Sequence, residues 1–233
     1  MRRVTRAGVT ALGAMVLTTA AHSAFAAKPD LTGVWAVTGT HSSLKTVEGT
    51  LPPLVPAAKA VYEKHLADAA KGDRKFDETT SCLPPGLPRL MLVKEPFEIL
   101  QRDKIIYFLH QLNRMPRRVY LGEQVPADAD PMYLGYSVAK WDGDALVIES
   151  SGFRDSTLLD DAGLPHSEAL HLTERYQLAA DGKTLHARFT IEDPRTFTRS
   201  WSTEANYVRR PGYEIPEDVC AERLATTHPK QRK

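Results

Sequence analysis

Short strand-like runs recur over most of the chain with little sequence between them, and this pattern constrains the fold most. The runs cover residues 31–37, 89–94, 97–102, 104–111, 117–122, 135–141, 145–150, 169–178, 183–192 and 200–208. Asp142-Gly143 and Asp181-Gly182 lie between paired runs and are strong hairpin signals, because a type I′ turn needs positive φ at both central residues. Successive hairpins without intervening helices predict an all-β fold, either an antiparallel lipocalin-like β-barrel or a strongly curved sheet.

One or two helices accompany the strands. Residues 56–72 have the helical pattern, with a proline in the first turn, apolar residues at helical spacing and a glycine as the stop: Pro56, Val61, Tyr62, Leu66, Ala69 and Gly72. Residues 81–90 contain three prolines, which restrict them to extended and turn conformations.

The N-terminal segment has the three parts of a secretory signal peptide. Arg2, Arg3 and Arg6 form a basic start, an apolar run covers residues 7–21, and small residues flank Phe25. The apolar run is too short for a stable membrane span. We therefore expect residues 1–26 to be a signal peptide and residues 27–233 to form a single domain that is periplasmic or secreted.

Charge and hydropathy limit the classes of partner. A formal net charge of +1 gives no reason to propose nucleic acid or an anionic membrane. No other apolar run approaches transmembrane length, so we expect no integral membrane segment in the mature chain. A small-molecule substrate or ligand is the expected partner, and the sequence leaves the oligomeric state open.

The mature chain contains two cysteines, Cys82 and Cys220. In an oxidising compartment the default outcome for such a pair is a disulfide. Neither cysteine lies in a C-x-x-C motif, so a reactive thiol has less support. We therefore predict a disulfide that closes most of the domain into one loop.

The hairpin around Asp181-Gly182 can be given a register. If these residues form the turn, Ala180 faces Lys183 and the pairing runs back two residues at a time. One face then pairs Leu178 with Leu185, Tyr176 with Ala187, Glu174 with Phe189 and Leu172 with Ile191. Glu174 is the lone charge on this apolar face, so it should either pair with a buried arginine or be held uncharged, and both situations are typical of functional sites.

The other face of the hairpin is wholly polar. It pairs Gln177 with His186, Arg175 with Arg188, Thr173 with Thr190 and His171 with Glu192. Like charges directly across a ladder repel, so an anion should lie near the two arginines, whether Glu192, Glu204 or a ligand carboxylate. The alternative is that this face only contacts solvent. The two faces cannot both line a cavity.

Further candidates lie on the runs before this hairpin. Arg118 and Tyr120 share one side of residues 117–122, and an arginine beside a phenol is a common recognition pair for carboxylates. Tyr136 adds another phenol at the start of a strand. The connection 150–170 is longer than a hairpin needs, which favours a binding loop that carries His166.

Standard motifs for cofactor and metal chemistry are absent. The sequence has no nucleophile elbow, dinucleotide fingerprint, P-loop or H-E-x-x-H motif. His166, Glu168 and His171 are metal ligands by type, but His166 and His171 point to opposite faces of a strand. We expect neither a cofactor nor a metal.

Several ordered segments carry a resemblance: "LTGVW", "CLPPGLPR", "PFEILQ", "RRVYLGE", "GYSVAKWDGDALVIESSGF", "PHSEALHLTERY", "TIEDP" and "VCAE". Together they resemble a group of exported bacterial proteins that has no established general activity and supplies no catalytic residues. The architecture is also similar to lipocalin-type barrels, among which phenolic acid decarboxylases act without a cofactor through tyrosines, an arginine and a glutamate. This second likeness is an analogy of fold only.

Two hypotheses of function follow. In the first, the protein is a cofactor-independent lyase of the decarboxylase type that acts on a small aromatic or hydrophobic carboxylate. The carboxylate would be bound by arginine and histidine and the chemistry performed by tyrosine, glutamate and histidine: Arg118, Arg175, Arg188 and His171 for binding, and Tyr120, Tyr136, Glu174 and His166 for catalysis. In the second, the same cavity binds a hydrophobic small molecule without chemistry.

Overall fold

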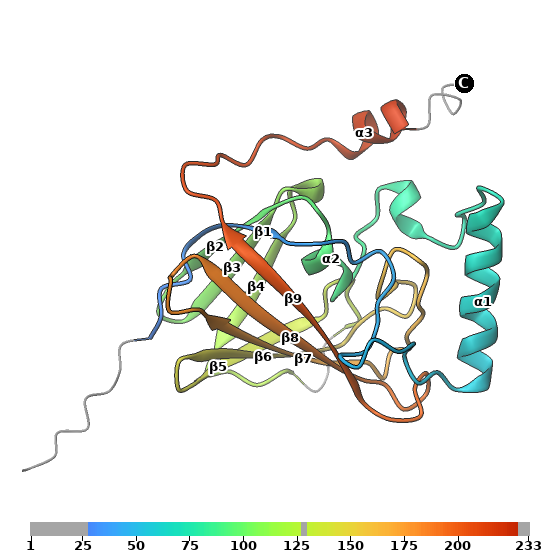
Figure 1. Ribbon diagram of the computed structural model, residues 1–233, viewed down its shortest axis with the longest axis horizontal. Helices are drawn as coiled ribbons and strands as arrows, with labels where there is room; N and C mark the ends of the chain where they lie inside the picture. Colours follow the sequence, from blue (N-terminus) through green and yellow to red (C-terminus); the bar gives the residue numbers. More distant parts are fainter. Residues whose placement is uncertain (1–27, 127–129, 228–233) are drawn as a thin grey trace, which may run out of the picture.

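The computed structural model describes residues 28–126 and 130–227. Within them, nine strands form one closed barrel in sequence order, with β1 paired to β9 (Figure 1). The strands are β1 Gly33–Val37, β2 Phe97–Gln101, β3 Ile105–His110, β4 Pro116–Leu121, β5 Tyr136–Asp142, β6 Ala145–Ser151, β7 His171–Leu178, β8 Thr184–Glu192 and β9 Trp201–Arg209. The all-β barrel predicted from the sequence is confirmed.

One pair of neighbouring strands departs from the antiparallel pattern. Strands β4 and β5 are parallel and pair Val119–Leu121 with Ser137–Ala139, whereas the other neighbours are antiparallel. A closed ring with an odd number of strands cannot alternate in direction throughout, so one pair must be parallel. The long connection from Gly122 to Gly135 makes this possible here, because a parallel pair needs a crossover rather than a tight turn.

The helices lie outside the barrel wall or at its ends (Figure 1). They are α1 Pro56–Ala70, the 3₁₀ turn η1 Glu78–Ser81, α2 Arg89–Leu92, the 3₁₀ turn η2 Leu112–Arg114 and α3 Cys220–Thr227. The helix predicted at 56–72 is confirmed, including its proline at the first turn.

The strand predicted at 89–94 is wrong, because these residues form the short helix α2. A short apolar run does not distinguish a strand from a buried helix by periodicity. All four residues of α2 are buried, and the Tyr207 hydroxyl donates to the Met91 carbonyl at 3.0 Å. This helix is therefore fixed by contacts with the barrel rather than by strand pairing.

The register of the β7–β8 hairpin agrees with the predicted pairing at every position, from Leu178 opposite Leu185 to His171 opposite Glu192. The β5–β6 turn differs by one residue: Asp142 pairs with Ala145, so the two-residue turn is Gly143-Asp144. Gly143 has φ of +61°, a conformation that glycine adopts without strain.

Large aromatic side chains fill the barrel interior. The buried aromatic residues of the strands include Trp35, Phe97, Phe108, Tyr176, Phe189 and Tyr207. Phe97 meets Tyr207 edge to face with ring centroids 5.2 Å apart, and Phe108 lies 5.8 Å from Tyr176. Such pairs stabilise beyond the burial of their area, so the wall of the barrel is rigid around the polar groups that it encloses.

The predicted disulfide is confirmed between Cys82 and Cys220, 138 residues apart in sequence. It joins the residue after η1 to the first residue of α3, and so holds the C-terminal segment beside the barrel. Among the described residues, no helix has the length and apolarity required to cross a membrane. The predicted signal peptide, residues 1–26, lies outside the described residues.

Candidate functional site

A buried ion pair crosses the inner face of the barrel. The guanidinium of Arg117, on β4, donates through Nη1 to Glu174 Oε1 at 3.1 Å and through Nη2 to Oε2 of the same carboxylate, on β7. The side chain of Glu174 is fully buried, and that of Arg117 is 1 % exposed. The sequence predicted that Glu174 pairs with a buried arginine or is held uncharged, and the structure shows the ion pair.

The two strands between β4 and β7 contribute a serine each to this pair. Ser137 on β5 and Ser150 on β6 face each other, with their hydroxyl oxygens 2.8 Å apart, and Arg117 Nη2 donates to both at 3.1 Å. The Tyr176 hydroxyl donates to Glu174 Oε1 at 2.8 Å. We call these five residues the interior cluster.

Electrostatics fix the protonation of the partners of Glu174. Burial opposes the charged form of Arg117, but the Glu174 carboxylate outweighs it and raises the pKa of the guanidinium. Burial, and then the negative charge of Glu174, raise the pKa of Tyr176 well above its ordinary value. At neutral pH the cluster therefore contains a cationic arginine and a neutral phenol that donates its proton.

His110, on β3, is a further buried polar group in the interior. Its side chain stacks at a tilt against Phe97, and neither ring nitrogen has a hydrogen-bond partner among the described residues. Burial, and then the positive charge of Arg117, lower the pKa of His110 to about 3. The imidazole is therefore neutral at neutral pH.

A pocket of about 510 Å³ opens where β4 and β5 diverge. Before Val119, β4 has no partner on β5, and the segment that leads into β5 forms the opposite wall. We call it the tyrosine pocket; its lining residues are Pro116, Arg117, Arg118, Tyr120, Pro131, Met132, Tyr133, Leu134, Gly135, Tyr136, Ser137 and Arg154. Arg117 and Ser137 belong to both the pocket and the interior cluster, so the pocket reaches the buried ion pair.

The phenols of the pocket have defined neighbours. Tyr120 and Tyr136 stack with ring centroids 5.2 Å apart, and the Tyr136 hydroxyl donates to Glu123 Oε2 at 3.2 Å. Desolvation and this hydrogen bond raise the pKa of Tyr136, so its hydroxyl is neutral and remains a donor. The guanidinium of Arg154 lies 5.0 Å from the centroid of the Tyr133 ring.

Three of the predicted site residues gather in this pocket: Arg118, Tyr120 and Tyr136. Within the described part of the chain, no ion-pair partner of Arg118 is present, and its side chain is exposed. Glu174 lies behind the pocket and contacts it through Arg117. These four predicted residues therefore belong to one region of the barrel.

The other three predicted binding residues lie on the outer face of β7 and β8. Arg175 pairs with Asp142 at 2.7 Å, Arg188 with Glu204 at 2.8 Å, and His171 Nδ1 lies 3.6 Å from Glu192. The repulsion between Arg175 and Arg188 is thus relieved by separate carboxylates on neighbouring elements. The structure does not bring this face together with Glu174 or with the tyrosine pocket.

His166 lies in the connection between β6 and β7, buried beneath the loop. Its Nδ1 lies 2.9 Å from the Ser167 carbonyl and its Nε2 lies 2.7 Å from the Thr157 hydroxyl. Since a carbonyl only accepts, Nδ1 carries a proton and donates it to Ser167; the Thr157 hydroxyl beside Nε2 also lies 3.1 Å from the Arg154 carbonyl. Burial lowers the pKa of His166, and the residue does not line the tyrosine pocket.

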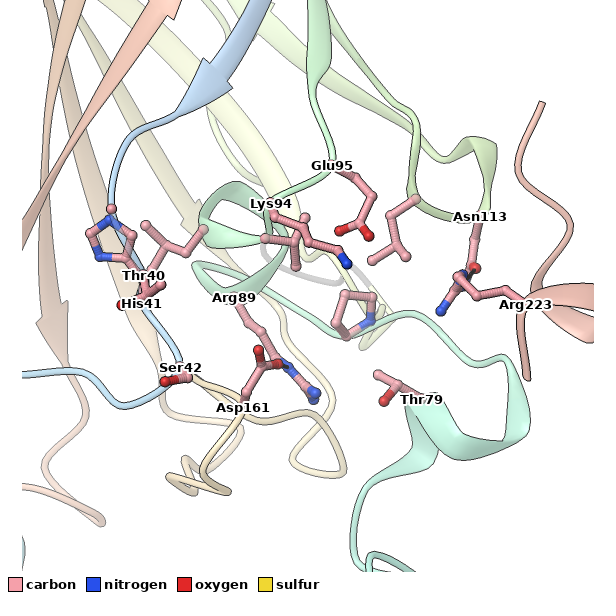
Figure 2. A pocket seen from close by; sticks show the side chains of 15 residues that line it. Thr40, His41, Ser42, Thr79, Arg89, Lys94, Glu95, Asn113, Asp161 and Arg223 are labelled. Atoms are coloured by element: carbon pink, nitrogen blue, oxygen red, sulfur yellow. Dashed lines mark hydrogen bonds and ion pairs between the residues drawn. The ribbon is translucent and has the colours of Figure 1, made fainter. Parts of the chain in front are cut away.

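A second polar cleft, of about 410 Å³, lies at one end of the barrel (Figure 2). Arg89 donates to both oxygens of Asp77, at 2.9 and 2.8 Å, and through Nε to Asp161 at 2.6 Å. Arg74 also donates to Asp77, at 2.9 Å. We call these four residues the end cluster; it ties α2 to the long β6–β7 loop and to the segment before η1.

The residue that sequence analysis missed is Arg117. Its neighbour Arg118 shares a side of β4 with Tyr120, and the same alternation puts Arg117 on the opposite side with Val119, where both are buried. The sequence feature that points to Arg117 is Glu174, the lone charge on an apolar strand face, because a buried carboxylate needs a cation beside it. An inward arginine on a predicted strand is the natural partner for such a carboxylate.

Comparisons with known proteins assign no family to this chain. No protein-family model matches the chain, and a search of curated proteins finds no match. Among the described residues, no group of three or more histidine, cysteine, aspartate or glutamate side chains is arranged to hold a metal ion.

Proposed function

We propose that this protein binds a small aromatic carboxylate in the tyrosine pocket, outside the cytoplasm. The observation that carries the proposal is the convergence of stacked phenols and arginines on one opening in the barrel wall: Tyr120 and Tyr136 beside Arg118, with Arg117 at the floor. The Cys82–Cys220 disulfide supports an oxidising compartment, periplasmic or extracellular.

The pocket supplies both kinds of contact that such a ligand needs. Phenol rings offer apolar faces for an aromatic ring, and the Tyr136 hydroxyl oxygen, whose own proton is donated to Glu123, can accept a hydrogen bond from a phenolic hydroxyl group. A guanidinium binds a carboxylate with two parallel hydrogen bonds. The volume of about 510 Å³ lies within the range of small-molecule sites.

A decarboxylase-type lyase is the second candidate, and the lyase predicted from the sequence remains a prediction. The observation that favours it is that Arg117 joins the pocket to Glu174 and Tyr176. A carboxyl group and a phenol near a bound substrate could transfer a proton during the loss of carbon dioxide. Both oxygens of Glu174 already accept hydrogen bonds from Arg117 and Tyr176, and Glu174 does not line the pocket, whereas the residues proposed for binding do.

Calorimetric titration of the purified protein with benzoate, 4-hydroxybenzoate and 4-hydroxycinnamate tests the proposal. We expect saturable binding with one site, weakened about tenfold or more by Arg118→Ala, since the loss of a carboxylate–guanidinium contact costs about 1.5–3 kcal/mol. Chromatography of the same mixtures after prolonged incubation detects decarboxylated product and decides between carrier and lyase.

Arg175→Ala is the matched control, because it removes an exposed arginine that pairs with Asp142 on the outer face of the barrel. It should leave binding unchanged. Equal loss of affinity in Arg118→Ala and Arg175→Ala, or no binding of any aromatic carboxylate, contradicts the proposed site.

A further inference from the structure

Nη2 of Arg117 has more acceptors within reach than it has hydrogens, and Nε, 3.3 Å from the Ser137 hydroxyl, gives that serine a second donor. Nη2 carries two hydrogens, yet Ser137, Ser150 and Glu174 Oε2 all lie within hydrogen-bonding distance of it. Glu174 Oε1 has two donors of its own, Arg117 Nη1 and the Tyr176 hydroxyl. One contact of Nη2 can therefore be exchanged while Glu174 stays anchored through Oε1.

The same guanidinium is reached from the tyrosine pocket, since Arg117 and Ser137 line it. A carboxylate that enters past Arg118 meets Arg117 at the floor. If it takes the Nη2 contact, two carboxylates then face one buried guanidinium. Two carboxylates that share one guanidinium leave one negative charge uncompensated in an apolar interior, where the protonated acid is far more stable, so the surplus charge must be removed.

We infer that binding of an aromatic carboxylate at Arg117 is coupled to the uptake of one proton by Glu174. The proton comes from the buffer and binds Oε2, the oxygen that loses its contact with Nη2. The ion pair between Arg117 and Glu174 is thereby replaced by an ion pair between Arg117 and the ligand, and the buried charge stays balanced. This inference rests on the proposed function, since it needs the ligand in the tyrosine pocket.

The titratable groups that face Glu174 are already protonated at neutral pH, so Glu174 itself is the expected acceptor of this proton. Arg117 from β4 is cationic, and Tyr176 from β7 and Tyr207 from β9 are neutral phenols, whose pKa values burial raises. Among the described residues, His110 from β3 is the other base near Arg117, and its pKa is held low by burial and by that cation. Glu174 and His110 are thus the two residues that the experiment must separate.

Titration calorimetry in buffers of different ionisation enthalpy measures the protons taken up per ligand bound. With 4-hydroxybenzoate at pH 7 we expect the uptake of about one proton, and a Kd that rises about tenfold per pH unit between pH 6 and 8. The neutral analogue 4-hydroxybenzamide is the matched ligand, and it should bind without proton uptake.

Variants identify the acceptor. In Glu174→Gln the uptake and the pH dependence of Kd should both disappear, whereas His110→Gln should retain them. Circular dichroism and thermal unfolding show whether each variant is folded. The calorimetry of the wild-type protein in different buffers tests the proton uptake even if a variant fails to fold.

The outcomes separate this inference from the proposed function. If 4-hydroxybenzoate binds the wild-type protein with no proton uptake, or if uptake persists in Glu174→Gln and is lost in His110→Gln, the coupling is wrong while the proposed function stands. If neither ligand binds, the proposed function and the coupling fail together.

Discussion

The molecule contains two buried arginine–carboxylate clusters, and they differ in how the positive charge is balanced. In the interior cluster, one guanidinium meets one carboxylate, and neutral hydroxyl groups complete the shell. In the end cluster, Arg89 meets both Asp77 and Asp161, and Arg74 adds a second cation. Each cluster borders a cleft, but the clefts differ in chemistry.

This difference separates a structural role from a binding role. Nε and both terminal nitrogens of Arg89 donate to carboxylates, and Asp161 is itself half exposed, so a ligand anion would have to compete with residues already in place. Nη2 of Arg117 has three acceptors for its two hydrogens, two of them neutral serines, and Arg117 lines a pocket that also contains phenols. The end cluster therefore fixes loops, whereas the interior cluster is suited to exchange.

Loss of one partner from the interior cluster should have the largest effect on stability. Arg117→Leu leaves the Glu174 carboxylate buried without its cation, and we expect the free energy of unfolding to fall by about 3–5 kcal/mol. In the double variant Arg117→Leu/Glu174→Leu no charge is left behind, so most of this loss should be recovered. Urea unfolding of the four proteins of this double-mutant cycle measures both terms. Equal destabilisation of the single and double variants contradicts the account.

The matched change in the end cluster should cost less. Arg89→Leu leaves Asp77 in contact with Arg74, and leaves Asp161 half exposed to water. We expect a loss of about 2 kcal/mol in the free energy of unfolding, from the unsatisfied part of Asp77. A loss as large as that of Arg117→Leu would show that the end cluster is as isolated from solvent as the interior.

The pH dependence of stability should differ between the two regions. The pKa of His110 is lowered from 6.5 to about 3 by burial and by Arg117, so between these values the unfolded chain binds more protons than the folded protein. The free energy of unfolding therefore falls as the pH falls below 6.5, by roughly 1.4 kcal/mol per pH unit. Burial opposes the charged form of Asp77, but Arg89 outweighs it and lowers its pKa, so the stability that Asp77 contributes is lost only below about pH 3.8.

Urea unfolding at pH 7, 6, 5 and 4 measures this contribution. His110→Leu should flatten the slope in this range, while the share of His166, whose pKa is also lowered by burial, should remain. A slope that is the same in the wild type and in His110→Leu contradicts the assignment.

The sequence predicted the barrel because most neighbouring strands are consecutive in the chain and residues typical of tight turns lie between them. The hairpin signal at Asp181-Gly182 gave the β7–β8 register directly. The parallel β4–β5 pair could not be foreseen, because the strand wrongly predicted at 89–94 raised the expected count to ten, an even number that closes with antiparallel neighbours throughout.

Part of the candidate site was predictable from the alternation of side chains along a single strand. Alternation along β4 brought Arg118 and Tyr120 to one side, and the structure adds Tyr136 to them from β5. The pairing of Arg117 with Glu174 depends on a side chain that crosses β5 and β6 on the inner face, and no local pattern reports such a contact. The exposed arginines Arg175 and Arg188 were harder to judge, because their partner carboxylates come from other elements.

A crystal structure of the protein with 4-hydroxybenzoate tests the central claim most directly, because the two clefts compete for the same ligand. We predict that the ligand lies in the tyrosine pocket, with its ring beside Tyr120 and Tyr136 and its carboxylate on Arg117 or Arg118. A ligand bound at Arg89 in the end cleft, with the tyrosine pocket empty, would contradict the account.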